Sequence, residues 1–250
     1  MTTGQPTPGA RASWTYVPAP RSEARVRLYC LPFLGAPAAF YAPLGDALPA
    51  AEARAIEIPG HGRRAAEPAV RDLRELIRTL AEVVRRDAAG RGIALFGHCS
   101  GGLLAYEVAR QLSPGPVLLA VSAAWAPRRW EHLIAANRSK PLSLLLPLVA
   151  EVAWDTRLYS AAWTALARAE VPTYLAYRHR EGAPVDCPIA AFGGRGDTAV
   201  EPRSLDDWAA YTTGRTTVRL YSGRHFYLRD HWAHVARDLA RELADAPPPG

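Results

Sequence analysis

The chain has 250 residues, of which 49% are hydrophobic and seven are tryptophan, so it can bury a sizeable core and is neither disordered nor fibrous. Thirty basic residues against 24 acidic residues give a net charge of +6. These charges are spread along the chain without a basic run, which excludes a nucleic-acid-binding arm. The excess of basic residues has two interpretations: the chain binds an acidic protein partner, or the excess is a simple bias of composition.

Three widely spaced cysteines, Cys30, Cys99 and Cys187, indicate neither a disulfide framework nor a zinc site. The N-terminus carries no apolar run, and no segment approaches the roughly 18 apolar residues of a membrane-spanning helix. We therefore expect a cytoplasmic protein with reduced thiols that needs no metal, cofactor or membrane. We also expect it to be a monomer.

Short β-type runs alternate with helical patterns along the chain. Strands are predicted at residues 26–30, 54–58, 93–96, 117–121, 189–192 and 218–221, and helices at 70–84, 103–112 and 233–243. Such alternation favours an α/β fold, a mostly parallel sheet with helices on both faces. Residues 1–24 and 246–250 are expected to be flexible tails of a single domain that spans 25–245.

The alternation stops between residues 127 and 178, where only helical patterns are found. An insertion between two strands of an open sheet lies over the edge formed by the carboxyl ends of the strands, where ligands bind. We expect residues 127–178 to form a helical lid over that edge. Two additional packing helices are the alternative.

The strongest motif is F-G-H-C-S-G-G at residues 96–102, between a predicted strand and a predicted helix. A nucleophile elbow needs small residues two positions before and two positions after the nucleophile. Gly97 and Gly101 meet that need around Cys99. A turn centred on Ser100 would instead place His98 two positions before the nucleophile, where an imidazole does not fit. Cys99 is therefore the predicted nucleophile, at a helix N-terminus that favours its thiolate. A buried structural thiol is the alternative.

In sites of this type an acid and then a histidine follow the nucleophile, each in the loop after a late strand. The run G-G-R-G-D after the strand at 189–192 ends in Asp197, and S-G-R-H after the strand at 218–221 ends in His225. His225 is predicted to deprotonate Cys99, and Asp197 is predicted to orient the imidazole.

Each of these assignments has a competitor. Asp197 is also a common type of turn residue, and Asp206 and Asp207 are carboxylates nearby in the sequence. Among the other histidines, His98 lies inside the elbow and is expected to point away from the nucleophile.

These motifs together resemble the type II thioesterases of polyketide and nonribosomal peptide biosynthesis, over about residues 25–240. The likeness includes L-Y-C-L-P-F-L-G-A at 28–36, P-G-H-G-R-R at 59–64, and G-R-H-F-Y-L at 223–228. The family normally carries serine in a G-H-S-M-G elbow, so Cys99 is a departure. Phe33 is another, because the family has histidine at that position.

The resemblance implies an α/β-hydrolase fold with an oxyanion hole formed by the backbone amides of Leu34 and Ser100. Phe33 and Trp125 are the residues expected to contact the acyl group, although aromatic rings of the lid are equally explained by packing. The implied partner is an acyl or peptidyl carrier protein that bears a phosphopantetheine-linked acyl group. Such carriers are acidic, so the positive net charge of the chain would favour their binding.

Cysteine changes the energetics of an acyl-enzyme, because a cysteine acyl-enzyme is itself a thioester. The expected function is a thioesterase that takes an acyl group from a carrier thioester onto Cys99 and releases it by hydrolysis. A cysteine-dependent acyltransferase or cyclase, which passes the group to a thiol, an amine or an internal nucleophile, is the close alternative. An inactive carrier-binding module and a serine-type esterase acting on free esters are the more distant ones.

Overall fold

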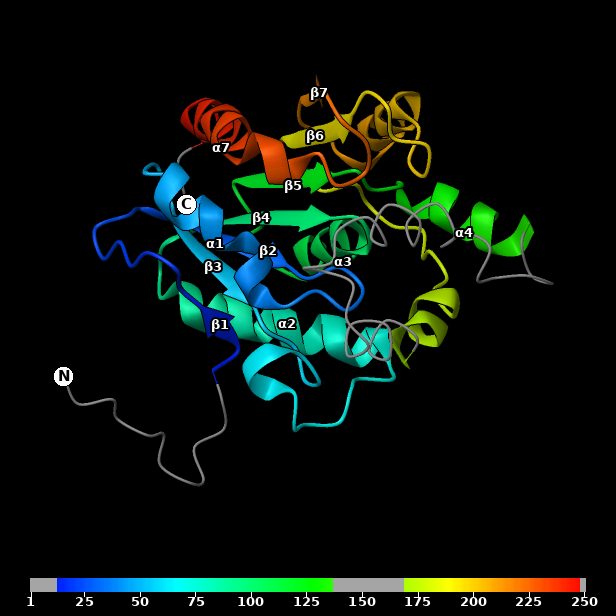
Figure 1. The fold of residues 1–250 in the computed structure, drawn as a ribbon, viewed down its shortest axis with the longest axis horizontal. Helices are drawn as coiled ribbons and strands as arrows, with labels where there is room; N and C mark the ends of the chain where they lie inside the picture. Colours follow the sequence, from blue (N-terminus) through cyan, green and yellow to red (C-terminus); the bar gives the residue numbers. More distant parts are fainter. Residues whose placement is uncertain (1–12, 137–168, 248–250) are drawn as a thin grey trace.

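The protein is described here by a computed structural model, which covers residues 13–136 and 169–247. Within these residues seven strands form one sheet in the order β1-β3-β2-β4-β5-β6-β7 (Figure 1). All neighbours are parallel except β1, which runs antiparallel to β3. The strands are β1 (Thr15–Tyr16), β2 (Val26–Leu31), β3 (Glu52–Ile56), β4 (Gly92–His98), β5 (Leu118–Ser122), β6 (Ile189–Gly194) and β7 (Thr216–Tyr221).

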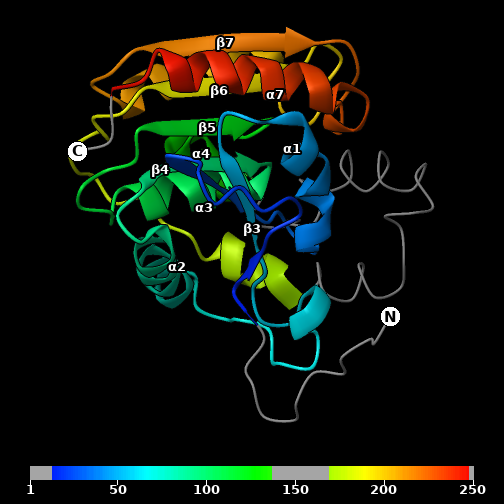
Figure 2. The same cartoon turned by 90° about the vertical axis from the view of Figure 1, so that its left-hand side faces the viewer.

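Helices cover both faces of this sheet. The named helices are α1 (Ala42–Ala47), α2 (Leu73–Ala88), α3 (Ser100–Ala109), α4 (Pro127–Ala136) and α7 (Leu228–Ala244), with 3-10 turns η1 (Ala38–Tyr41), η2 (Gly62–Arg64) and η4 (Pro202–Tyr211). Helices α2 and α3 pack side by side on one face, and α1 and α7 pack together on the other (Figures 1 and 2). The predicted α/β fold with a mostly parallel sheet is confirmed.

The sheet separates two cores, because successive residues of a strand point to opposite faces. In β2, Tyr29 and Leu31 join the core under α2 and α3, whereas Leu28 and Cys30 join the core under α1 and α7. Burial on both faces explains why these strands read as continuous apolar runs.

Helix α2 confirms the predicted apolar stripe and starts three residues later than expected. The Asp72 carboxylate accepts hydrogen bonds from the amides of Arg74 at 2.8 Å and Glu75 at 3.3 Å, and so caps the helix at Leu73. The residue after its last turn, Ala89, has a left-handed backbone with φ of 50°, which ends the helix.

The domain begins earlier in the chain than expected. The backbone carbonyl of Trp14 accepts a hydrogen bond from the Glu57 amide at 2.8 Å, and the Arg64 guanidinium lies 3.8 Å from the centroid of the Trp14 ring. Together with the pairing of β1 and β3, these contacts make the expected flexible tail of residues 1–24 wrong for residues 14–16. The sequence analysis did not predict β1, because a strand of two residues is too short to show an alternation of apolar and polar side chains. Residues 1–12 and 248–250 lie outside the described residues.

The predicted lid at 127–178 is described only at its two ends. Helix α4 occupies residues 127–136, and residues 169–175 are again helical. The part of the lid at 137–168 lies outside the described residues, so the lid remains a prediction. Among the helices that the structure describes, none is long and apolar enough to span a bilayer.

Candidate active site

Cys99 lies in a very tight turn between β4 and α3. Its backbone has φ of 53° and ψ of −126°, a conformation that a residue with a side chain adopts only under constraint. A Cβ atom added to Gly97 would lie 2.0 Å from the carbonyl oxygen of Gly101, and one added to Gly101 would lie 2.5 Å from that of Leu31. Only glycine fits at these two positions. The turn therefore has the geometry of a nucleophile elbow, with Cys99 at its tip.

His225 and Asp197 meet at the same edge of the sheet, in the loops after β7 and β6. The imidazole Nδ1 lies 2.8 Å from the carboxylate Oδ2, and both side chains are buried. The other carboxylate oxygen accepts hydrogen bonds from the amides of Ala199 and Val200, each at 2.9 Å. Three hydrogen bonds to the carboxylate fix its orientation toward the imidazole.

The competing carboxylates both lie in η4 and neither is buried, whereas His225 is fully buried, and Asp206 is exposed to solvent. Asp207 lies in η4 and forms an ion pair with Arg129 at 2.6 Å, with both side chains partly exposed. Asp197 is therefore the acid that the fold brings to His225.

The charge environment of His225 links it to Cys99. Complete burial by itself would lower the pKa of the imidazole. The negative charge of a Cys99 thiolate, together with the hydrogen bond to Asp197, outweighs burial and raises the pKa of His225. Cys99 and Asp197 thus both act on His225, which can hold the proton that the thiol gives up.

His98 lies beside this group, which the sequence analysis did not expect. The ring centroids of His98 and His225 are 5.0 Å apart, and His98 Nδ1 is 3.0 Å from Ser122 Oγ, which in turn is 2.7 Å from the hydroxyl of Tyr227. Burial first, and then the positive charge of His225, lower the pKa of His98 well below its usual value. A neutral His98 is compatible with a protonated His225, whereas two charged imidazoles in contact would repel.

The loop after β2 is tied to the elbow and to the helix at 169–175. The amide of Leu34 donates to Ser100 Oγ at 3.0 Å, so this expected oxyanion donor is held by a neighbouring hydroxyl. The amide of Gly35 donates to Glu170 at 2.8 Å, and the other carboxylate oxygen of Glu170 is 3.0 Å from His61 Nε2. Both partners of this carboxylate–imidazole contact are buried. Sequence reasoning missed Glu170, which stands in no motif, and it noted His61 only as part of the P-G-H-G-R-R likeness, without a contact to this loop.

The two predicted substrate-binding aromatics lie in different groups of rings. Phe33 packs in one apolar cluster with Cys99, and its ring centroid is 4.9 Å from that of Phe40. Trp125 instead lies 5.4 Å from the ring of Trp130, a residue of α4, by ring centroids. Phe33 therefore shares a cluster with Cys99, whereas Trp125 packs against the ring of an α4 residue at the start of the predicted lid.

Comparison with known proteins identifies the family. Residues 26–243 match the thioesterase domain family. The type II thioesterase BorB from the borrelidin biosynthetic cluster superposes with a TM-score of 0.78 at 31% identity, over 94% of this chain and 100% of that one. The chain belongs to the type II thioesterase family of α/β-hydrolases.

Other members are similar along nearly the whole chain. Thioesterase PikA5 of Streptomyces venezuelae is 30% identical over 236 residues, which are 90% of this chain and 83% of that protein. Gramicidin S biosynthesis protein GrsT of Aneurinibacillus migulanus is 28% identical over 233 residues, 89% and 90% of the two chains. The RedJ thioesterase of the prodiginine pathway of Streptomyces coelicolor has a TM-score of 0.76 at 26% identity, over 95% of this chain and 97% of that one.

The electrostatic coupling of His225 to Cys99 predicts the pH dependence of thiol reactivity. His225→Ala removes the group that accepts the thiol proton, so alkylation by iodoacetamide at pH 7 should slow roughly tenfold or more and recover only at higher pH. Asp197→Ala should slow it less, because the carboxylate orients the histidine without taking the proton.

Alkylation is measured by intact mass over a pH series. Burial raises the pKa of both Cys30 and Cys187, the latter to about 12, so these thiols should stay unlabelled, and Cys99→Ala supplies the blank. An alkylation profile identical in the wild type and His225→Ala would show that the two side chains are not paired.

Proposed function

We propose that this protein takes an acyl group from a carrier-protein thioester onto Cys99 and releases it by hydrolysis, in the cytoplasmic biosynthesis of a polyketide or nonribosomal peptide. The observation that carries the proposal is the thiol at the tip of a nucleophile elbow, whose charge acts on a buried His225–Asp197 pair. Family membership supplies the substrate class, since the relatives include a thioesterase named for a biosynthetic cluster and a gramicidin S biosynthesis protein.

The proposed reaction assigns one role to each group. His225 accepts the thiol proton, and the Cys99 sulfur attacks the thioester carbonyl. The tetrahedral intermediate then collapses, the carrier thiol leaves with the proton from His225, and a thioester to Cys99 remains. In the second half, His225 takes a proton from water, which attacks the acyl-enzyme carbonyl. The C–S bond then breaks, the carboxylic acid is released, and Cys99 leaves as the thiol with the proton from His225.

The oxyanion of the intermediate is proposed to bind the backbone amides of Ser100 and Leu34. Ser100 is the first residue of α3, where backbone amides have no partner within the helix and the helix dipole is positive. The Leu34 amide donates to Ser100 Oγ, so its participation requires that this hydroxyl turn away or be displaced by the oxyanion.

The acyl chain is proposed to contact Phe33, which shares a cluster with Cys99 and is packed against Phe40 and Phe226. These rings give the sulfur an apolar neighbour on which a hydrocarbon chain loses contact with water. Trp125 is proposed as a more distant contact, reached only by a longer chain.

A second candidate function, transfer of the acyl group to a thiol, an amine or an internal nucleophile, is favoured by the sulfur itself. A thioester acyl-enzyme is close in free energy to the carrier thioester, so acylation is reversible and an acceptor competes with water. Cys99 is also 9% exposed among apolar residues, which limits the access of water.

The nucleophile assignment predicts which variant still forms an acyl-enzyme. Cys99→Ala should form no adduct with an acyl thioester, because the attacking atom is gone. Ser100→Ala should still acylate, because its hydroxyl holds the Leu34 amide and is not the nucleophile. Intact-mass spectrometry after exposure to the thioester measures both, and an adduct of acyl mass on Cys99→Ala would refute the assignment.

Replacement of the sulfur by oxygen tests which product the thiol favours. Cys99→Ser forms an oxygen ester that returns its acyl group poorly to thiols, so the ratio of free acid to transferred product should rise. Turnover itself should fall, because the site positions a larger and more acidic atom. The ratio is measured with a carrier-bound acyl donor and a competing thiol or amine. An equal ratio for the two enzymes would mean that the pocket, and not the sulfur, selects the acceptor.

A further inference from the structure

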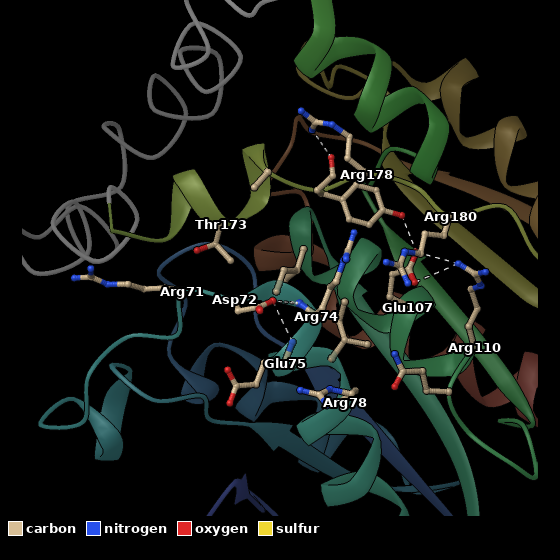
Figure 3. Close-up of a pocket in the computed structure, with 15 residues that line it drawn as sticks. Arg71, Asp72, Arg74, Glu75, Arg78, Glu107, Arg110, Thr173, Arg178 and Arg180 are labelled. Carbon is tan, nitrogen blue, oxygen red and sulfur yellow. Dashed lines mark hydrogen bonds and ion pairs between the residues drawn. The ribbon is translucent and has the colours of Figure 1, made fainter.

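A cleft rich in arginine lies between α2, the end of α3 and residues 173–180 (Figure 3). Its volume is about 790 Å³, and two walls contribute basic side chains. The first wall is α2 with the residues before it, and the second is formed by the end of α3 and the segment after the helix at 169–175. The charged residues that line it are Arg71, Arg74, Arg78, Arg110, Arg178 and Arg180, with Asp72, Glu75 and Glu107.

Two of the three carboxylates in the cleft are already engaged. Asp72 accepts hydrogen bonds from the first amides of α2. Glu107 forms an ion pair with Arg110 at 3.3 Å and accepts a hydrogen bond from the hydroxyl of Tyr177 at 2.6 Å. Within the part of the chain that the structure describes, the five remaining arginines form no ion pair with a carboxylate. The cleft therefore presents a surplus of positive charge to solvent.

Helix stability does not explain this charge. Arg74 and Arg78 are exposed on successive turns of α2, and like charges four residues apart repel by a few tenths of a kcal/mol. They also lie in the first two turns, where the helix dipole favours acidic side chains. A negatively charged ligand in the cleft would relieve both effects.

The helix at 169–175 links the cleft to the loop beside the proposed site of acylation. Thr173 of this helix lines the cleft, as does Ala176 just after the helix ends. Glu170, one turn before Thr173, accepts a hydrogen bond from the amide of Gly35, and the neighbouring amide of Leu34 donates to Ser100 of the elbow. A protein bound in the cleft would lie against the helix that holds this loop.

We propose that this arginine cleft is the docking surface for the acidic carrier protein that delivers the acyl group. The inference rests on the proposed function for the identity of the partner, and on charge complementarity for the place. Positive charge on two walls of a cleft of this size suits an acidic helix of a folded partner better than a single phosphate group.

Charge reversal on α2 tests the docking surface. In the variant Arg74→Glu/Arg78→Glu, KM for an acylated acidic carrier protein should rise about tenfold or more, with kcat little changed, since two attractive pairs become repulsive. The same acyl group on N-acetylcysteamine, a small uncharged thioester, should be turned over as by the wild type. Arg85→Glu is the matched control, because Arg85 is exposed on the same helix outside the cleft. It should leave both substrates unaffected.

A binding measurement keeps the test independent of catalysis. The Kd of the fluorescently labelled carrier for Cys99→Ala should rise by the same factor when the two cleft arginines are reversed, and should rise with salt for the parent more steeply than for the reversed variant. An unchanged Kd and KM in the reversed variant would overturn the proposal. So would an equal effect of Arg85→Glu, an equal loss on the small thioester, or no binding of the carrier to the parent.

The two proposals fail differently. If the wild type forms no acyl adduct with either thioester, the proposed function fails, and the Kd series still decides whether an acidic carrier binds the cleft. If both thioesters are turned over but charge reversal changes nothing, only the docking surface is wrong.

Discussion

The close approach of backbone around Cys99 is the constraint on which the site depends. The carbonyl of Gly101 lies where a Cβ of residue 97 would be, and the carbonyl of Leu31 lies where a Cβ of residue 101 would be. This approach forces a positive φ on Cys99, places its sulfur at the carboxyl edge of the sheet and brings the first amide of α3 beside it. A side chain at Gly97 would push β4 away from α3, and one at Gly101 would push α3 away from the end of β2, so either would disturb all three features.

Burial then determines how the site holds charge. His225 and Asp197 are almost fully removed from water, which is unfavourable for charge unless partners compensate. The amides of Ala199 and Val200 compensate for the carboxylate, and the carboxylate and the thiolate compensate for the imidazolium. His98, held neutral by its own burial, adds a polar contact without adding a competing positive charge. The arrangement tolerates a proton on His225 and disfavours a second one nearby.

The sequence predicted the parts of the site that depend on local patterns. The elbow is a contiguous motif, and Asp197 and His225 follow apolar strands whose order places them at one edge of the sheet. The parts that were missed depend on contacts between distant segments. Glu170 reaches Gly35 across 135 residues, and the hydroxyl of Ser100 reaches Leu34 across 66. Nothing near these residues in the sequence indicates these contacts. Each contact is a single hydrogen bond between segments that come together only when the sheet has formed. The edge strand at Thr15 was missed for a similar reason, since pairing with β3 holds it in place and its own composition does not mark it as a strand.

The helix at 169–175 lines the arginine cleft through Thr173 and holds the loop beside the elbow through Glu170. Two ligands that meet the same element can be energetically linked, and such linkage is reciprocal. If a bound carrier makes the acyl-enzyme more favourable at equilibrium, the acylated enzyme must bind that carrier more tightly by the same factor. If the carrier disfavours the acyl-enzyme, acylation must weaken the carrier's hold and promote its departure. The sign of this coupling would decide whether the spent carrier stays as an acceptor or leaves so that water can complete the reaction.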